Sequence, residues 1–361
     1  MLEPATWWNR SRPASRQSAL ERMPKWLICI PLTLQWLGLA LRYRSLTLPS
    51  SANPAVTSGG LVGEGKLEYF KLMGPLARSF TAMSCGVRVQ HPADDTQLAR
   101  AMANCGLVFP IIAKPDLGLC GYGVRRIDDA RALNLYMTGF PVGETVVLQQ
   151  YLPQDGEAGI FYARDPVTHE GRIIGLALRY FARVQGDGHS TVAQLMAADQ
   201  RALRLLTSER HEVNLDLDRV PAAGERVRLS TIGSTRVGGL YRDGAELITP
   251  ALTTAVEAIA KDIQLFHFGR LDVRFDTLAE LAQGRSFTIM EVNGAGSEAI
   301  QAWDPATRLW AGFQMIFAKQ ALLFAIGHEQ RTNGFLPISV GALFRLNQRQ
   351  NQLIKQYPPS N

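Results

Sequence analysis

The stretch Gly269–Phe275 reads GRLDVRF, and a second, Ser286–Asn293, reads SFTIMEVN. In the first stretch every second residue is charged and those between are apolar: Arg270, Asp272 and Arg274 alternate with Leu271, Val273 and Phe275. Because residues i and i+2 of a strand share a face, this pattern predicts a strand with one face on a core and one charged face on a site.

The second stretch predicts a partner strand. Glu291 and Asn293 would share one face, with Met290 and Val292 on the other. Residues 277–285 form a short connection, so an antiparallel hairpin would place Asp272 beside Glu291 and Asn293. Two carboxylates and an amide oxygen are hard ligands that suit Mg²⁺. The alternative is an amphipathic hairpin whose charged face is simply solvated.

A glycine-rich segment follows an earlier apolar strand. Residues 110–125 read PIIAKPDLGLCGYGVR, in which Lys114 ends the strand and glycines occupy 118, 121 and 123. Glycines let a loop bend over phosphates and present backbone N–H groups, and Lys114 would add a positive charge. No GxxxxGK[ST] motif occurs, and the glycine spacing does not fit a dinucleotide-binding fingerprint.

A third apolar strand, residues 146–151, runs into a loop that contains Glu157. Such a strand could contact an adenine through backbone groups, and Glu157 could accept hydrogen bonds from ribose hydroxyls. A solvated loop glutamate is the alternative.

In this order the motifs resemble the ATP-grasp superfamily, especially D-alanine–D-alanine ligase and related carboxylate–amine ligases. The resemblance covers about residues 66–300, and its pieces are FPIIAKPDLGLCGYGV, VVLQQYL with GEAGIF, GRLDVRF and IMEVNGAGSEA. The segment RVQGDGHSTVAQL is similar to the corresponding stretch of glutathione- and cyanophycin-synthetase-type members.

The resemblance implies a role for each matching residue. As catalytic residues, Arg270 would stabilise the acyl-phosphate transition state and Lys114 would bind the α/β phosphates. The loop with Gly118, Gly121 and Gly123 would close over the phosphates, and Asp272, Glu291 and Asn293 would hold Mg²⁺, with Mn²⁺ as a substitute. The hinge residues Gln149, Gln150, Tyr151 and Leu152 would hold the adenine, and Glu157 would bind the ribose. Arg179 would stand in place of a phosphate-binding lysine of the family. An earlier lysine of the family pattern would be either Lys66 or Lys71.

The sequence also departs from the family pattern. Gln149 and Gln150 stand where relatives often have an acid and a lysine. After Asn293 the chain reads GAGSE rather than the threonine/proline pattern of the dipeptide ligases, and the first 65 residues match them poorly. The acid and the amine are therefore left open.

Strands and helices mix without strict βαβ alternation, which favours an α+β fold with antiparallel sheets. The resemblance implies an ATP-grasp fold, two α+β subdomains clasping ATP, preceded by a smaller N-terminal α/β domain. The expected boundaries are a disordered basic extension (1–25), an N-terminal domain (26–76), a small subdomain (77–156), a large metal and catalytic subdomain (157–327) and a C-terminal tail (328–361). Helices are expected over 191–207 after Ser190, from Pro250, and from Asp304-Pro305 to about Ile326.

The formal net charge of +6 lies almost wholly at the front, since residues 1–45 hold seven Lys/Arg against two Glu. The nearly neutral body is not expected to bind nucleic acid. The apolar run from Trp26 to Leu41 is expected to be a buried helix, and a membrane-surface segment is the alternative. The start could be Met1 or Met23. Four cysteines without a CxxC pair favour the cytoplasm, with membrane association through the N-terminal segment as an alternative.

The expected function is an ATP-dependent carboxylate–amine ligase that releases ADP and phosphate. The partners would be a small carboxylic acid and an amine, amino acids among them, and the sequence is compatible with a homodimer and with peripheral membrane contact through residues 10–45. The alternatives are a small-molecule phosphotransferase on the same fold and a non-catalytic ATP-binding module.

Overall fold

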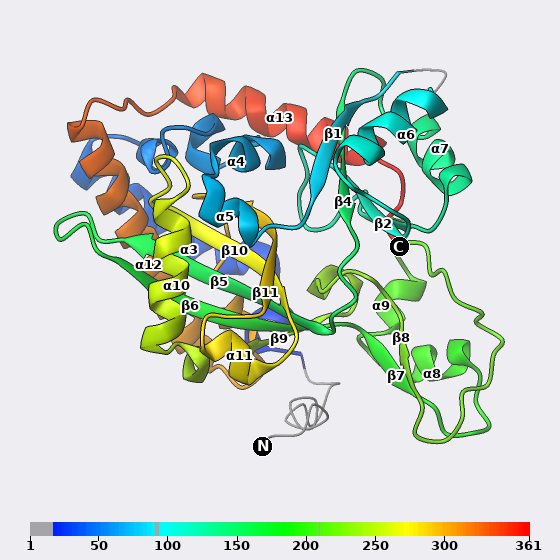
Figure 1. Ribbon diagram of the computed structural model, residues 1–361. Coiled ribbons are helices and arrows are strands. Elements are labelled where there is room, and N and C mark those ends of the chain that lie inside the picture. Colours follow the sequence, from blue (N-terminus) through cyan, green and yellow to red (C-terminus); the bar gives the residue numbers. More distant parts are fainter. Residues whose placement is uncertain (1–16, 91–93, 209) are drawn as a thin grey trace.

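Two antiparallel sheets organise the chain in the computed structural model, which describes residues 17–90, 94–208 and 210–361 (Figure 1). The α+β class predicted from the sequence is confirmed by these sheets and by the helices packed against them. The expected disordered extension lies mostly outside the described residues.

The smaller sheet has the strand order β1-β4-β2-β3 in the described part of the chain. Its strands are Ser84–Arg88, Thr145–Gln150, Ile111–Pro115 and Arg125–Ile127, in that order. Two capped helices, α6 (Asp95–Asn104) and α7 (Ala130–Thr138), share one apolar core with this sheet. Asp94 and Asp129 cap these helices by accepting hydrogen bonds from first-turn N–H groups, as N-cap aspartates do.

The larger sheet has the order β11-β10-β5-β6-β9 among the described strands. Their bounds are Phe287–Asn293, Phe268–Phe275, Gly156–Arg164, Gly171–Tyr180 and Leu240–Asp243. One face packs on α10 (Pro250–Lys261), α4 (Lys66–Leu72), α5 (Pro75–Ser79) and α11 (Leu278–Ala282). Thr249 caps α10 and Pro250 opens it, as the sequence predicts.

A lateral ribbon of β7 (Arg183–Gln185) and β8 (Arg226–Arg228) carries its own small core. The single helix expected over 191–207 is instead α8 (Val192–Ala198) and α9 (Leu203–Leu206), and the cap is Thr191 rather than Ser190. The interruption has a local cause, because the Asp199 side chain accepts from the N–H groups of Arg201 and Ala202 and starts a new turn. Two 3₁₀ turns follow, η3 (Thr235–Val237) and η4 (Ala245–Leu247).

The N-terminal part differs from the expected α/β unit. Residues 17–83, all of which the structure describes, form helices and no β-strand. These helices are α2 (Ala19–Arg22), α3 (Lys25–Tyr43), η1 (Leu48–Ser51), η2 (Thr57–Gly60), α4 and α5. The expectation of a buried helix over residues 26–41 is also wrong, because α3 buries only Ile28 and Ala40. It packs along α12 (Leu309–Thr332) and leaves its other side exposed.

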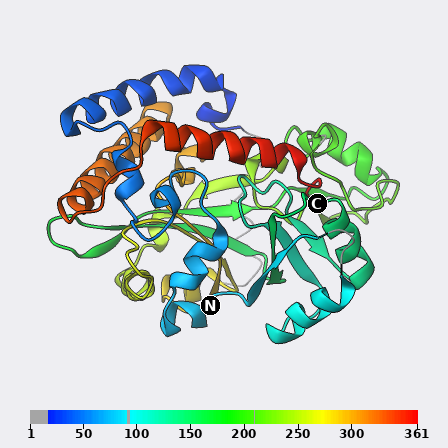
Figure 2. The same ribbon diagram turned by 90° about the horizontal axis from the view of Figure 1, so that it is seen from above.

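The C-terminal part is ordered into a helix rather than a peripheral tail. After η5 (Ile300–Trp303), α12 begins at Leu309 and not at Pro305. The Asp304 carboxylate accepts from Arg242 and from the N–H groups of Asp243 and Ala306. The last helix, α13 (Val340–Gln356), crosses the molecule from the α12 end to the smaller sheet (Figure 2). Its Leu353 and the following Tyr357 are buried in the core of that sheet.

Two helices of the described chain, α3 and α12, are long and apolar enough to cross a membrane by length and composition alone. Helices that form the core of a protein pass the same test, and α12 contributes Phe313, Leu323, Phe324 and Ile326 to the core.

Candidate functional site

The hairpin expected at the centre of the site is present. Strands β10 and β11 pair antiparallel with Arg270 opposite Asn293 and Asp272 opposite Glu291. The apolar set of β10 is fully buried in the main core, as the alternation predicts. A bulge after Asp272 disturbs this alternation on β11. The Met290 sulfur therefore accepts from Nε of Arg274 at 3.3 Å, which corrects the expectation that Met290 shares the core face with Val292.

Asp272 lies at the centre of a buried hydrogen-bond network. It is 3% exposed, and its carboxylate accepts from Nε and Nη2 of Arg270 (2.6 and 3.0 Å). Nη2 of Arg179 reaches both of its oxygens at 3.1 Å, and Nδ2 of Asn293 reaches Oδ2 at 3.1 Å. Burial alone raises the pKa of Asp272, but the Arg179 and Arg270 guanidiniums outweigh it and hold that pKa below its usual range.

The same network extends to Glu157, the expected ribose acceptor. Register brings Glu157 opposite Arg179 on β6 and opposite Arg274 on β10. Its Oε1 accepts from Arg179 at 3.1 Å and its Oε2 lies 3.2 Å from Arg274. Glu157 is 4% exposed and paired with two arginines, so it is part of the ionic network of the sheet rather than a solvated loop residue.

Lys114 approaches this network from the smaller sheet. Its Nζ donates to Oε1 of Gln149 at 2.9 Å and to the carbonyl of Met290 at 3.0 Å. Gln149 donates to the same carbonyl at 3.0 Å, so these two residues of the smaller sheet contact β11 directly. Burial lowers the pKa of Lys114 to about 8, against the opposing influence of Glu291.

The structure distinguishes the two lysines that the sequence left open. Lys66, at the start of α4, is nearly buried, and its Nζ lies 3.5 Å from Oε1 of Glu291 and 3.3 Å from the carbonyl of Asp116. Lys71, at the end of the same helix, is exposed. Lys66 is therefore the lysine that belongs to the cluster.

The glycine loop lies beside Lys66, because a Cβ built on Gly118 would be 2.9 Å from the Lys66 Nζ. Cys120, Gly121 and Gly123 adopt positive φ values of 49°, 74° and 72°, which glycine accommodates at low cost. The hydroxyl of Tyr357 donates to the carbonyl of Leu117 at 2.6 Å.

Further contacts fix the loop from its outer side. These bonds run to loop carbonyls from Gln350 (Gly118, 3.3 Å), Arg236 (Cys120 and Gly121, each 3.1 Å), Tyr136 (Gly123, 2.8 Å) and the Asn361 N–H (Val124, 3.2 Å). Two of these donors, Gln350 and Asn361, belong to residues 328–361, which the sequence predicted to be a C-terminal tail.

The expected adenine hinge joins the two sheets. The N–H of Gln150 donates to the carbonyl of Met83 at 2.8 Å, and Leu152 is 8% exposed. The Arg126 guanidinium lies 4.7 Å from the centroid of the Tyr151 ring, a cation–π contact. Gln149 faces Lys114, as described above, and β5 begins directly after the hinge at Gly156.

Sequence reasoning missed Glu64 and Tyr69, two polar residues next to this cluster. Burial, together with Glu291 and Glu68, raises the pKa of Glu64 to about 7, although Lys66 opposes the shift. The Tyr69 hydroxyl and the Ser297 Oγ are buried and, within the described part of the chain, have no hydrogen-bond partner.

Two backbone contacts explain this arrangement of loops. The N–H groups of Ala295 and Gly296 donate to the carbonyls of Gly59 and Gly60 at 3.1 and 2.6 Å. The loop that follows Asn293 thereby packs on residues 59–60, and Tyr69 lies against both. A long-range packing of this kind leaves no local sequence signal, although the repeated glycines of SGG and NGAG are consistent with close backbone approach.

The cluster can be tested as a metal site by the chemistry of its donors. Among the described residues, no group of three or more His, Cys, Asp or Glu side chains is placed to hold a metal ion. The candidate set is instead two carboxylates and one amide. Asp272 and Glu291 lie opposite each other. Asn293 donates to Asp272 through its Nδ2, so this bond does not use its Oδ1. This set fits Mg²⁺ in kind, but the lone pairs of Asp272 are taken up by two arginines and Asn293.

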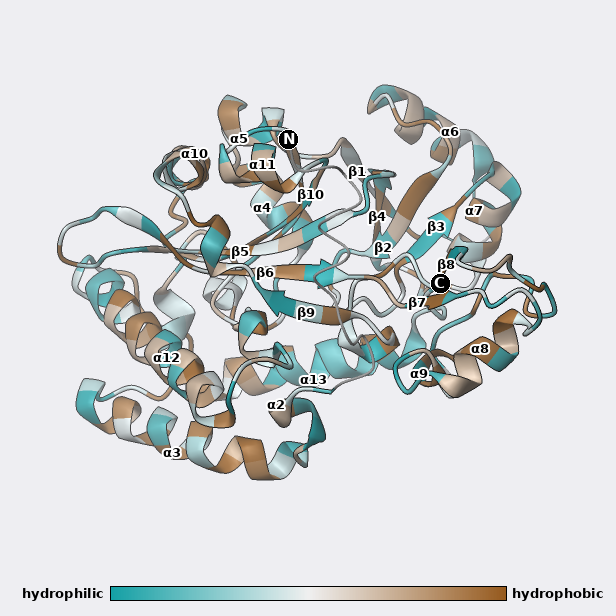
Figure 3. Cartoon of the chain, turned by 90° about the horizontal axis from the view of Figure 1, so that it is seen from below, coloured by the Kyte–Doolittle hydropathy of each residue, from teal (hydrophilic) through white to brown (hydrophobic). Residues whose placement is uncertain are grey.

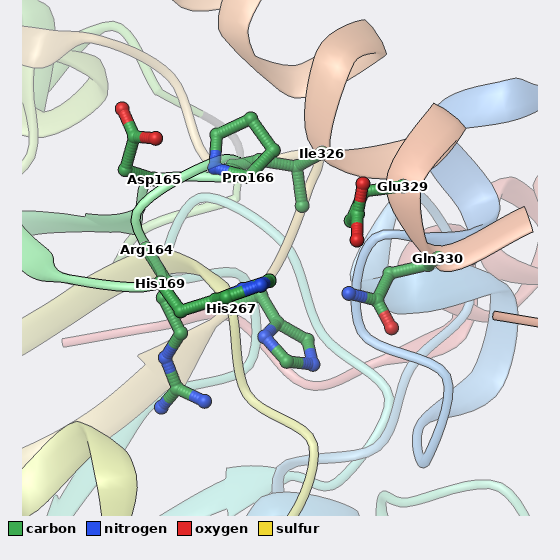
Figure 4. A pocket seen from close by; sticks show the side chains of 8 residues that line it. All are labelled: Arg164, Asp165, Pro166, His169, His267, Ile326, Glu329 and Gln330. Atoms are coloured by element: carbon green, nitrogen blue, oxygen red, sulfur yellow. The ribbon is translucent and has the colours of Figure 1, made fainter. Parts of the chain in front are cut away.

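A separate small cavity, of about 10 Å³, lies at the turn between β5 and β6 against the end of α12 (Figure 4). Arg164, His169 and His267 contribute to its lining, and none of the candidate site residues does. Burial and the neighbouring Arg164 and His169 lower the pKa of His267 to about 4. The cavity has room for one water molecule.

No family model and no curated protein matches the chain. Among solved structures, it is similar to a bifunctional glutathione synthetase from Pasteurella multocida (17% identity, 70% of this chain and 36% of that one, TM-score 0.35). It is also similar to an ADP complex of N5-carboxyaminoimidazole ribonucleotide synthetase (14%, 69% and 49%, 0.36) and to a D-cycloserine synthetase (15%, 74% and 69%, 0.37).

The chain thus spans about a third to a half of the length of the first two of these proteins.

Proposed function

We propose that the protein is an ATP-dependent carboxylate–amine ligase that works through an acyl phosphate. The observation that carries the proposal is the register of β10 and β11, which places Asp272 opposite Glu291, near cationic side chains from β10 itself and from three other elements, α4, β2 and β6. Five cations and three anions meet there among the described residues: Lys66, Lys114, Arg179, Arg270 and Arg274 with Glu157, Asp272 and Glu291.

This excess of positive charge suits a triphosphate. Lys66, which lies next to the glycine loop, and Lys114, which lies between the sheets, would bind phosphate oxygens. The glycine loop would cover the phosphates, and the hinge at residues 149–152 would hold the base between the sheets. When bound, Mg²⁺ would reduce the repulsion between the substrate carboxylate and the triphosphate, held by Asp272, Glu291 and Asn293.

In this mechanism Arg270 changes its partner. In this structure the Arg270 guanidinium donates hydrogen bonds to Asp272 and to the carbonyl of Glu298. On ATP binding, Arg270 would turn toward the transferring phosphoryl group and leave Asp272 oxygens free to act as ligands. Because the Arg270 side chain is only 11% exposed, solvent would screen its charge little as it meets the charge that develops there.

The acyl phosphate would then meet the amine near the loop that follows Asn293. Exclusion of water by the glycine loop would protect this intermediate from hydrolysis. No enzyme nucleophile is required, because the substrate carboxylate itself attacks the γ-phosphate.

A screen for ADP release, with carboxylic acids crossed against amines and amino acids and read out by product mass, tests the activity. An amide together with free phosphate supports a ligase. A phosphorylated product without an amide indicates a phosphotransferase, and ATP binding without turnover across the panel indicates a non-catalytic module; either result rejects the proposal.

The two lysines of α4 offer a matched pair for the ATP site. Lys66→Met should weaken ATP binding at least tenfold, because it removes a nearly buried phosphate contact. Lys71→Met, the same substitution at the exposed end of the helix, should leave binding within twofold. Calorimetry with a non-hydrolysable ATP analogue measures both, and equal effects of the two substitutions would contradict the assignment.

A further inference from the structure

The exposed side of α3 is a continuous apolar stripe. Six large apolar residues on it are between 39% and 79% exposed: Trp26, Leu27, Ile30, Leu34, Leu37 and Leu41. At 100° per residue they fall within a sector of about 100°. The stripe runs for about 22 Å at 1.5 Å per residue, and residues 26–41 contain no charged side chain. Figure 3 shows α3 at the edge of the molecule, away from both large sheets.

The opposite side of α3 is attached to the protein. Ile28 packs with Phe313 in one apolar cluster, and Ala40 packs with Phe324 in another. The Gln35 side chain donates to the carbonyl of Phe317 at 2.9 Å. The Trp36 ring packs edge-on against Phe324 at 4.9 Å between centroids. The helix therefore lies lengthwise along α12, and the stripe is on the side that faces away from it.

Both ends of the stripe carry positive charge. Arg22 and Lys25 precede it and Arg42 and Arg44 follow it, and all four are exposed. Residues 22–45 contain no acidic residue, and the only acid of α2, Glu21, is buried and paired with Arg201 at 2.8 Å. An apolar band between two basic ends is complementary to a membrane surface, which offers acyl chains below anionic headgroups.

We propose that α3 docks the protein on an anionic lipid surface, with the stripe immersed at the boundary between headgroups and acyl chains and the four basic residues on lipid phosphates. The helix lies in the plane of the membrane, because its inner side stays packed on α12. The inference is independent of the proposed ligase activity, since α3 contributes none of the site residues.

Flotation of the full chain with vesicles tests this inference. The protein should bind vesicles of phosphatidylcholine mixed with phosphatidylglycerol more tightly than phosphatidylcholine alone, and salt should weaken the binding. Leu34→Ser/Leu37→Ser should lower the partition coefficient at least tenfold. Arg42→Gln/Arg44→Gln should lower it about fivefold for each arginine on anionic vesicles alone.

A matched control replaces two apolar residues that are equally exposed but lie on the smaller subdomain. Leu135→Ser/Val142→Ser, at positions 74% and 66% exposed, should bind vesicles as the unchanged protein does. Urea denaturation confirms that each variant is folded, and Leu41→Ser, at 79% exposure, is a second stripe variant.

Three results would overturn the inference. The first is absence of binding to anionic vesicles by the unchanged chain. The second is equal binding by the stripe variants and the control. The third is a dimer that the stripe variants dissociate while vesicle binding is absent, because the stripe would then be an interface between two copies of the chain.

Discussion

The central carboxylate of the network allows the sharpest test of the structure. Asp272→Asn removes the charge that Arg179 and Arg270 share and leaves both guanidiniums facing a neutral amide. The Arg270 and Arg179 side chains are only 11% and 12% exposed, so solvent screens them little. Removal of one partner of a buried ion pair costs about 3–5 kcal/mol, and we expect a loss of this size in the free energy of unfolding at pH 7.

The same substitution at an exposed pair is the control. Asp128 pairs with Arg126 at 2.7 Å, with side chains 55% and 39% exposed. Asp128→Asn should therefore cost less than about 1 kcal/mol. Urea denaturation of the three proteins measures these differences.

The dependence on pH supplies a second readout. Because the pKa of Asp272 is held below its usual range, its contribution is fully present above the unfolded-state pKa of about 3.9. It is lost as the pH falls through the still lower folded-state pKa. The difference between the unchanged protein and Asp272→Asn should thus stay constant from pH 5 to 8 and shrink below about pH 4.

Stabilisation by added magnesium and ATP distinguishes a role of Asp272 in ligand binding from a purely structural ion pair. A ligand at 100 times its dissociation constant stabilises the folded state by about 2.7 kcal/mol, and this gain should appear in Asp128→Asn and vanish in Asp272→Asn. A loss of less than 1 kcal/mol on Asp272→Asn would refute the electrostatic reasoning. Full stabilisation of that variant by magnesium and ATP would refute the assignment of the site.

Three further predictions concern the loops around the site. Gly60→Ala should lower the free energy of unfolding by about 3 kcal/mol or more, because the new Cβ meets the Tyr69 hydroxyl and the Gly294 backbone at a φ of +74°. Gly334→Ala, at a φ of +94° with open space around it, should cost about 1 kcal/mol. Urea denaturation measures both, and equal costs would contradict the close packing at Gly60. Since the pKa of Glu64 is raised to about 7, its contribution to stability is full at pH 4 and is lost as the pH rises to 7. The free energy of unfolding of Glu64→Gln should therefore increase relative to that of the unchanged protein over this range. A difference that does not change with pH would argue against the burial of this carboxyl. Tyr357→Phe removes the bond to the Leu117 carbonyl and should lower protection of glycine-loop amides in hydrogen exchange, with unchanged exchange in α10 as the internal control.

The sequence predicted the centre of the site better than its surroundings. Alternation in GRLDVRF gave the face of each β10 residue, and the short connection gave the pairing of Asp272 with Glu291, because both depend on local geometry. The position of Met290 could not be predicted, since a bulge appears only when two strands pair. The choice of Lys66 over Lys71 likewise required knowledge of where α4 packs.

The termini were the least predictable part. The expected tail contains a helical pattern at Leu343, Leu346, Leu353 and Ile354, and its glutamines and asparagines obscured the signal. Similarly, length and hydropathy describe α3 equally well as a core helix or as a surface helix. Only the packing on α12 shows which side is free.

The route of α13 has a mechanical consequence. It is a helix of 17 residues, about 25 Å long. Its first turn lies near the end of α12, and Gln350 in its second half and Tyr357 directly after it donate to carbonyls of the glycine loop. In the proposed function, lifting the loop to admit or release a nucleotide would have to move the C-terminal end of α13 or break the bonds from Gln350 and Tyr357, besides those from Arg236 and Tyr136. A single helix thus connects the α12 end of the molecule to the glycine loop.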